Sequence, residues 1–116
     1  AENRPQVSPG TSIKDVIVEI SQKRLGVTAV VENNKLIGII TDGDIRRMLE
    51  KHDNFIGISA KDIMTKNPKT VEPDAMVVDA LNVMENFSIT QLVVTQNQQY
   101  KGIIHLHDIL KEGIVG

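Results

Sequence analysis

A threonine and an aspartate three residues apart, Thr41 and Asp44, stand where an apolar run gives way to a polar segment. At the first turn of a helix, free backbone N–H groups and a threonine hydroxyl can hold a phosphate. An aspartate at the same place can accept hydrogen bonds from ribose hydroxyls. The same spacing is that of a capping box, in which the two side chains only satisfy the backbone of the helix start. Spacing alone leaves both interpretations open.

Two arginines follow after Ile45, and their position suggests an anion nearby. Arg46 and Arg47 lie near the expected start of this helix, where positive charge opposes the helix dipole. Such a pair of cations suits a phosphate or a carboxylate. The alternative is that both are solvated, or pair with Asp42 or Glu50. We count Asp42 with the two arginines among the candidate ligand-binding residues.

A second segment repeats the pattern with a histidine in place of the threonine. His105 takes that place, Asp108 keeps the acidic one, and a protonated imidazole can hold an anion. His105 and His107 with one aspartate are a weak metal signal without further ligands, so we predict no metal site. The other interpretation is that these are exposed polar residues at the end of a strand.

Three further polar residues lie between the two segments, at Thr65, Asn67 and Thr70. Polar groups in such a connection can hydrogen-bond a base or a ribose. Turn and capping roles explain them equally well.

These candidate residues recur because the chain contains an internal repeat. Residues 7–49 and 71–110 align at a shift of roughly 64 positions, and such self-similarity usually reports architecture. Each copy begins with one apolar stripe at the i, i+3, i+4, i+7 spacing of an amphipathic helix. The two stripes are Ile13, Val16, Ile17 and Ile20, and Val77, Ala80, Leu81 and Met84.

Short apolar runs then predict a pair of strands in each copy. The runs are residues 29–31 and 36–40 in the first copy, and 92–94 and 100–104 in the second. Asn33 and Asn34 tolerate positive φ and predict the tight turn of a hairpin. Gly38 and Gly102 occupy matching places, which favours a close approach of backbone there. A second helix is expected to close each copy.

Each copy is therefore a β-α-β-β-α unit, too small to bury its own sheet, so two units must pack together. We expect an α/β (α+β) fold with a first unit over residues 1–52 and a second over residues 71–116. Residues 53–70 form the linker and the approach to the second unit. Ser59 and Asp62 predict a capping box for a short helical turn within that linker.

Composition excludes several functions. The chain has 116 residues, a net charge of -2, no cysteine, no tryptophan, two phenylalanines and one tyrosine. Binding of a polymeric nucleic acid would need a basic patch and aromatic stacking platforms, and neither is visible in this sequence. Thiol catalysis and disulfides are excluded, which fits a cytoplasmic protein. No apolar run approaches a bilayer span, and no spacing supports a nucleophile–base pair, so we expect neither a membrane protein nor an enzyme.

The chain resembles a known protein family. Residues 38–44 and 102–108 are similar to the Gly-apolar-apolar-Thr/Ser-x-x-Asp signature of CBS motifs. Residues 62–71 resemble the sequence segment with which a CBS motif usually begins. The resemblance covers nearly the whole chain. It implies a pseudo-two-fold pair of motifs with two clefts, which in many members bind adenosyl or other nucleotides. Residues 1–6 contain no counterpart of the segment 62–71, so we expect the first motif to begin upstream of Ala1.

Residues 18–26, 41–49 and 105–115 are further similar to the C-terminal CBS pair of arabinose-5-phosphate isomerases. The resemblance implies a regulatory module without catalytic residues, joined to an upstream sugar-isomerase domain. Its ligand would be a nucleotide or nucleotide-sugar, with CMP-Kdo, AMP and ATP as candidates. Two alternatives stay open. One is a ligand-free module that forms a homo-oligomer through apolar helix residues such as Ile45, Met48 and Ile109. The other is an adenine-nucleotide-sensing pair of another enzyme or transporter.

Overall fold

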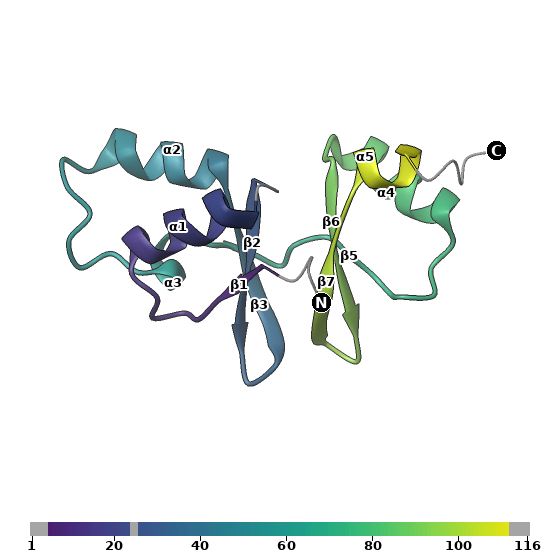
Figure 1. The fold of residues 1–116 in the computed structure, drawn as a ribbon, viewed down its shortest axis with the longest axis horizontal. Coiled ribbons are helices and arrows are strands. Elements are labelled where there is room, and N and C mark those ends of the chain that lie inside the picture. Colours follow the sequence, from purple (N-terminus) through teal and green to yellow (C-terminus); the bar gives the residue numbers. More distant parts are fainter. Residues whose placement is uncertain (1–4, 24–25, 112–116) are drawn as a thin grey trace.

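The computed structural model of the chain describes residues 5–23 and 26–111. Figure 1 shows two lobes side by side, with a β-hairpin of each lobe facing the centre and the helices outside. The molecule measures 48 × 28 × 24 Å. Each lobe holds one sequence repeat, which confirms the expected mixed fold of α-helices and β-strands.

The first lobe contains a short strand, a helix, a hairpin and a second helix. These elements are β1 (Gln6–Val7), α1 (Ile13–Lys23), β2 (Val27–Glu32), β3 (Lys35–Thr41) and α2 (Asp42–Lys51). Two short elements lie in the connection, α3 (Ala60–Ile63) and β4 (Thr65–Lys66). The second lobe repeats the pattern with β5 (Thr70–Val71), α4 (Val77–Phe87), β6 (Gln91–Gln96), β7 (Gln99–His105) and α5 (Leu106–Lys111).

The two hairpins are built alike. Asn33 and Asn34 have φ values of 54° and 66°, and Asn97 and Gln98 have 54° and 69°. Two consecutive left-handed residues form the type I′ turn whose twist matches that of the flanking strands. Each hairpin also shifts register by one residue just before its turn, at Val30/Val31 and at Val94/Thr95. The hairpin turn predicted at Asn33 and Asn34 is confirmed.

The two lobes join through the tips of these hairpins. The strand order is β1-β2-β3-β7-β6-β5, and β3 meets β7 where Lys35 pairs with Gln99. The Leu36 N–H donates to the Gln98 carbonyl at 3.2 Å, and the Tyr100 N–H donates to the Asn34 carbonyl at 3.0 Å. Leu36 matches Tyr100 in the repeat, and Asn34 matches Gln98. The two bonds are therefore related by a pseudo-two-fold axis at the Lys35–Gln99 pair.

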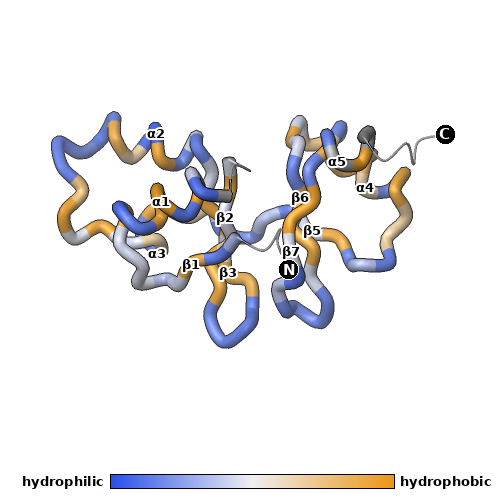
Figure 2. Tube along the Cα trace, viewed as in Figure 1, coloured by the Kyte–Doolittle hydropathy of each residue, from blue (hydrophilic) through white to orange (hydrophobic). Residues whose placement is uncertain are grey.

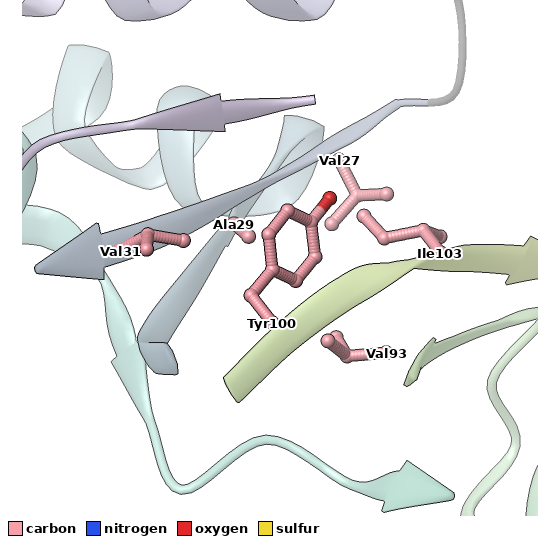
Figure 3. Close-up of a cluster of buried hydrophobic side chains, with 6 residues drawn as sticks. All are labelled: Val27, Ala29, Val31, Val93, Tyr100 and Ile103. Carbon is pink, nitrogen blue, oxygen red and sulfur yellow. The ribbon is translucent and has the colours of Figure 1, made fainter. Parts of the chain in front are cut away.

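Three apolar clusters hold the structure together. One lies between the lobes, where Tyr100 packs among Val27, Ala29, Val31, Val93 and Ile103 (Figure 3). The Tyr100 hydroxyl donates to the Pro5 carbonyl at 2.7 Å, which ties the second lobe to the approach to β1. Each lobe also has its own apolar cluster between its strands and its helices. The strands are accordingly mostly apolar, whereas the exposed hairpin tips are hydrophilic (Figure 2).

The apolar helix residues considered for oligomerisation do not form a free surface. Met48 and Ile109 are buried in their own lobes, and Ile45 packs against the first lobe's cluster. The expectation that Met48 and Ile109 are available to a second copy is therefore wrong, whereas Ile45 is only partly buried. The helical period placed them on the inward face, where each lobe must cover its own sheet.

The linker contains more structure than the sequence indicated. Ser59 and Asp62 form the predicted capping box of α3. Beyond it, β4 pairs antiparallel with β3 at Gly38 and Ile39, where a polar connection was expected. A Cβ at Gly38 would lie 2.8 Å from the Met64 Sδ and 2.9 Å from the Thr65 carbonyl oxygen. The close approach predicted at this glycine is therefore between β3 and the linker. Among the described residues, no helix has the length and apolarity to cross a bilayer.

Candidate ligand-binding cleft

A cleft of about 260 Å³ lies between the two lobes. Its walls are apolar side chains from the hairpins of both lobes and from the end of α4, and its polar groups come from strand ends and the linker. The lining residues are Val27, Ile39, Thr41, Thr65, Asn67, Pro68, Lys69, Phe87, Ile89, Gln91, Val93 and Ile103. Thr41, Thr65 and Asn67 were candidates from the sequence, and the fold brings them to this one cleft.

Thr41 is the N-cap of α2. Its hydroxyl accepts from the Asp44 N–H at 3.2 Å, and the Asp44 Oδ2 accepts from the Thr41 N–H at 3.0 Å. The Thr41–Asp44 spacing therefore forms a capping box, the structural alternative stated above. Thr41 also lines the cleft, so the capping role does not remove it from a ligand's reach.

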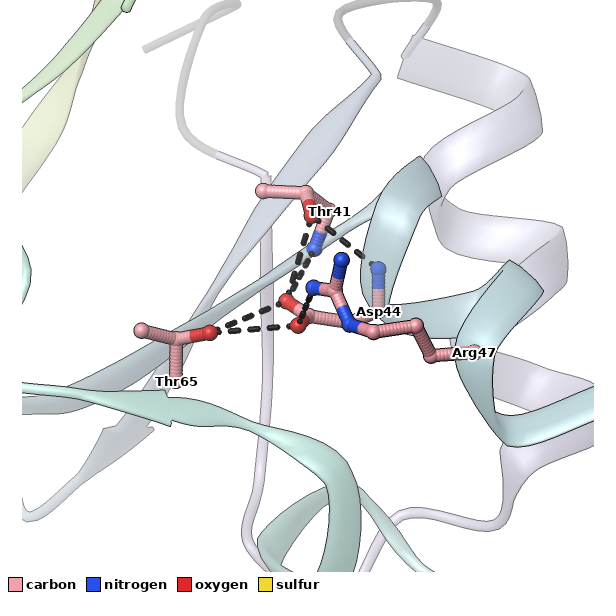
Figure 4. A network of polar contacts seen from close by, with 4 residues as sticks. All are labelled: Thr41, Asp44, Arg47 and Thr65. Carbon is pink, nitrogen blue, oxygen red and sulfur yellow. Dashed lines mark hydrogen bonds and ion pairs between the residues drawn. The ribbon is translucent and has the colours of Figure 1, made fainter. Parts of the chain in front are cut away.

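Asp44 is held entirely by groups of the chain (Figure 4). It is 7% exposed, and its Oδ1 accepts from Arg47 Nη2 at 2.6 Å. The Thr65 hydroxyl donates to Oδ1 at 3.1 Å and lies 3.3 Å from Oδ2. With the two bonds from Thr41, these contacts fill about four acceptor positions of a carboxylate. Asp44 does not line the cleft; it fixes α2, Arg47 and β4 to one another.

The paired arginines reach back over the first turn of α2. A Cβ at Gly43 would lie 3.4 Å from Arg47 Nη1 and 3.7 Å from Arg46 Nη2. Arg47 remains 62% exposed despite its ion pair with Asp44, and Arg46 is exposed. Asp42 is also exposed, and its N–H donates to the Gly26 carbonyl at 3.1 Å. None of Asp42, Arg46 and Arg47 lines the cleft.

The linker candidates separate into two groups. Thr65 and Asn67 face the cleft, and Asn67 has a left-handed φ of 55° at the turn after β4. Thr70 lies inside β5, paired with Val93, and is not a lining residue. Of the three linker candidates, the two that precede β5 therefore line the cleft, and the one inside β5 does not.

In the second repeat, His105 is placed as Thr41 is in the first, immediately before a helix. Its Nδ1 accepts from the His107 N–H at 3.0 Å, which caps the start of α5. The His107 side chain is exposed. The side chain of Asp108 lies outside the described part of the structure. Among the described residues, no group of three histidine or carboxylate side chains is arranged to hold a metal ion.

Three polar or aromatic cleft residues were not among the sequence candidates. The Lys69 Nζ lies 4.1 Å from the centroid of the Phe87 ring, and both side chains line the cleft. The residues are far apart in sequence and have no motif spacing, so only the scarcity of aromatic residues could have drawn attention to Phe87. Gln91, at the start of β6, is the third such polar or aromatic lining residue.

Comparison with known proteins identifies the architecture. A family model described as CBS domain matches residues 2–51 and 60–114. The chain belongs to the CBS domain family. The arabinose 5-phosphate isomerase KdsD of Yersinia pestis is 40% identical over 112 residues, and KdsD of Francisella tularensis is 44% identical over 108. The alignments cover 96% and 92% of this chain, but it spans only about a third of the length of these relatives (34% and 33%).

Solved CBS structures share the fold at lower identity. A structure of CBSX2 in complex with AMP has a TM-score of 0.84 at 22% identity, covering 98% of this chain and 90% of that chain. A CBS domain protein from Pyrobaculum aerophilum complexed with AMP has a TM-score of 0.79 at 24% identity, covering 97% of this chain and 94% of that chain. These likenesses show that the two lobes are a CBS pair.

Proposed function

We propose that this CBS pair is the regulatory module of an arabinose-5-phosphate isomerase and binds a nucleotide or nucleotide-sugar in the cleft between its lobes. The observation that carries the proposal is the cleft itself, which combines mostly apolar walls with a few polar side chains. Ligand sites commonly have this composition, with few polar groups that fix orientation. The resemblance to KdsD and the AMP complexes of similarly folded proteins support it.

The cleft offers distinct surroundings to the parts of a nucleotide. Ile39, Val93 and Ile103 present aliphatic surface to a flat base. Thr65 and Gln91 can hydrogen-bond a sugar or the edge of a base, since hydroxyl and amide groups both donate and accept.

AMP, ATP and CMP-Kdo are the candidate ligands. AMP is present in two structures with the same fold, so it is the first to test. CMP-Kdo carries a phosphate and a carboxylate, and such anionic groups would suit the exposed cations Arg46 and Arg47 at the start of α2, outside the lining of the cleft.

The isomerase chemistry would lie in the part of the protein that this chain does not span. Binding would favour one arrangement of the two lobes, and that arrangement would bias the attached catalytic domain. We place the parent enzyme in the cytoplasm, consistent with a chain that contains no cysteine.

Isothermal titration of the chain with AMP, ATP and CMP-Kdo tests the proposal. We expect saturable binding of at least one, weakened several-fold by Thr65→Val, which removes a cleft hydroxyl together with its hydrogen bond to Asp44. Thr70→Val is the matched control, because Thr70 belongs to the same linker but does not line the cleft. Absence of binding to the folded chain, or equal losses in both variants, would contradict a nucleotide site here.

A second candidate function is homo-oligomerisation without a ligand. Val18, Leu49 and Val78 are large apolar side chains that remain about half exposed on α1, α2 and α4. Sedimentation equilibrium distinguishes the two functions. A stable oligomer that binds none of the three nucleotides, and that Leu49→Lys dissociates, would favour this candidate.

A further inference from the structure

Two side chains that line the cleft, Lys69 and Phe87, contact each other from different parts of the second half of the chain. Lys69 lies in the linker between β4 and β5, and Phe87 is the last residue of α4. The Lys69 Nζ stands 4.1 Å from the ring centroid, within the range of a cation–π contact. Both residues line the cleft, so the contact forms part of its wall.

The end of α4 fixes the position of the ring. Ser88 adopts a left-handed φ of 54°, and the Ile89 N–H donates to the Met84 carbonyl at 2.9 Å. This arrangement ends the helix at Phe87 and turns the chain towards β6, so that Ile89 and Gln91 also line the cleft. Phe87 is 51% exposed, which leaves ring surface open to whatever approaches the cleft.

Lys69 is the one cationic side chain among the described residues that line this cleft. Among the described residues, the ion pair found is the one between Arg47 and Asp44. The Lys69 ammonium therefore lies within ion-pair distance of no described carboxylate. An aromatic face is a weaker partner for an ammonium than an anionic oxygen, which forms a charge-assisted hydrogen bond. The ammonium is therefore positioned at the cleft and available to an anion.

We propose that Lys69 makes the cleft selective for the phosphorylated form of its ligand, and that Phe87 is a positioning residue that holds the ammonium there. The inference rests on the proposed nucleotide-binding function and assigns the charged end of the ligand to the linker. Arg46 and Arg47 are the competing assignment, because they are exposed at the start of α2 but do not line the cleft.

The test is the ratio of two affinities, for AMP against adenosine and for CMP against cytidine, measured by calorimetry on the whole chain. We expect Lys69→Gln to lower the ratio roughly tenfold, the loss of one charge-assisted hydrogen bond. Lys69→Arg should restore most of it. Phe87→Leu should lower the ratio by less, because the ammonium remains but is no longer held. Lys66→Gln is the matched control, since Lys66 is an exposed lysine of β4 outside the cleft.

The outcomes separate this inference from the proposed function. Nucleotide binding with an unchanged ratio in Lys69→Gln, or a fall in Arg46→Gln instead, would overturn the role of Lys69 and leave the nucleotide site intact. Binding of no nucleotide or nucleoside would overturn both. A ligand-independent readout checks Phe87. The ε-methylene protons of Lys69 should be shifted upfield by the ring current and should lose that shift in Phe87→Leu; normal shifts in the parent chain would contradict the contact.

Discussion

The Thr65 hydroxyl donates to the Asp44 carboxylate across 21 residues of sequence, at 3.1 Å from Oδ1. This bond joins the linker to the first turn of α2 (Figure 4), and Thr65, unlike Asp44, lines the cleft. The position of β4, and with it Thr65 and Asn67, therefore depends on a buried carboxylate that belongs to the signature of the first repeat.

Replacing Asp44 should destabilise the fold. Asp44→Asn keeps the shape but cannot accept from Thr41, Arg47 and Thr65 together. We expect a loss of about 1–3 kcal/mol in the free energy of unfolding, measured in urea. Asp42→Asn is the matched control, because Asp42 is exposed in the same turn. Equal, small losses in both variants would show that the network contributes little.

A methyl group at Gly38 should displace the linker. The added Cβ would lie 2.9 Å from the Thr65 carbonyl oxygen, so β3 and β4 would have to separate. We expect Gly38→Ala to cost about 1–3 kcal/mol, typical of overpacking. Its chemical shift changes should concentrate at residues 64–67. Gly10→Ala serves as the control, since no atom lies within 4 Å of its Cβ position. A Gly38→Ala chain as stable as the parent would contradict this packing.

The buried hydroxyl of Thr28 lowers the stability of the fold. Thr28 is fully buried, and its Oγ1 has no hydrogen-bond partner. Leu92 occupies the matching place in the second repeat, within that lobe's apolar cluster. We expect Thr28→Val to stabilise the chain by about 1 kcal/mol, because it removes an unsatisfied polar atom at nearly constant volume. Thr90→Val, at an exposed position, should change little. A destabilised Thr28→Val chain would indicate that the hydroxyl has a partner in solution.

The capping box of α3 should be visible in the titration of Asp62. Hydrogen bonds from the Ser59 N–H and hydroxyl hold the pKa of the Asp62 carboxyl below its usual range. A lowered pKa in the folded state means that this interaction stabilises the fold above the unfolded-state pKa. The contribution is lost as the pH falls through the folded-state pKa. NMR titration should place the Asp62 pKa below that of an ordinary aspartate, and Ser59→Ala should raise it. An ordinary value in the parent chain would contradict the box.

Local patterns in the sequence predicted the elements of each repeat. The apolar stripe that begins at Ile13 became the buried face of α1, and Asn33 with Asn34 formed the turn. The spacing of Ser59 and Asp62 predicted α3. These features depend on neighbours within one turn or one hairpin, so their physics is contained in short segments of the chain.

Contacts between distant segments were beyond that reasoning. The strand β4 exists because Gly38 lets the linker approach β3, and nothing in residues 65–66 alone indicates a strand. The Lys69–Phe87 contact depends on where α4 ends relative to the linker. Spacing also could not decide that Asp44 is held by Arg47 and Thr65, because Thr65 reaches it only in the folded chain.

The central claim is that the cleft between the lobes receives a nucleotide, and NMR mapping of AMP on the labelled chain tests it most directly. We predict saturable shift changes at residues of both lobes that line the cleft, namely Ile39, Thr65, Gln91 and Val93. Residues of the outer helix surfaces, such as Val18, should not move. Saturable changes confined to the outer surface of α2, or no change at these four residues at saturating AMP, CMP-Kdo and ATP, would contradict the account.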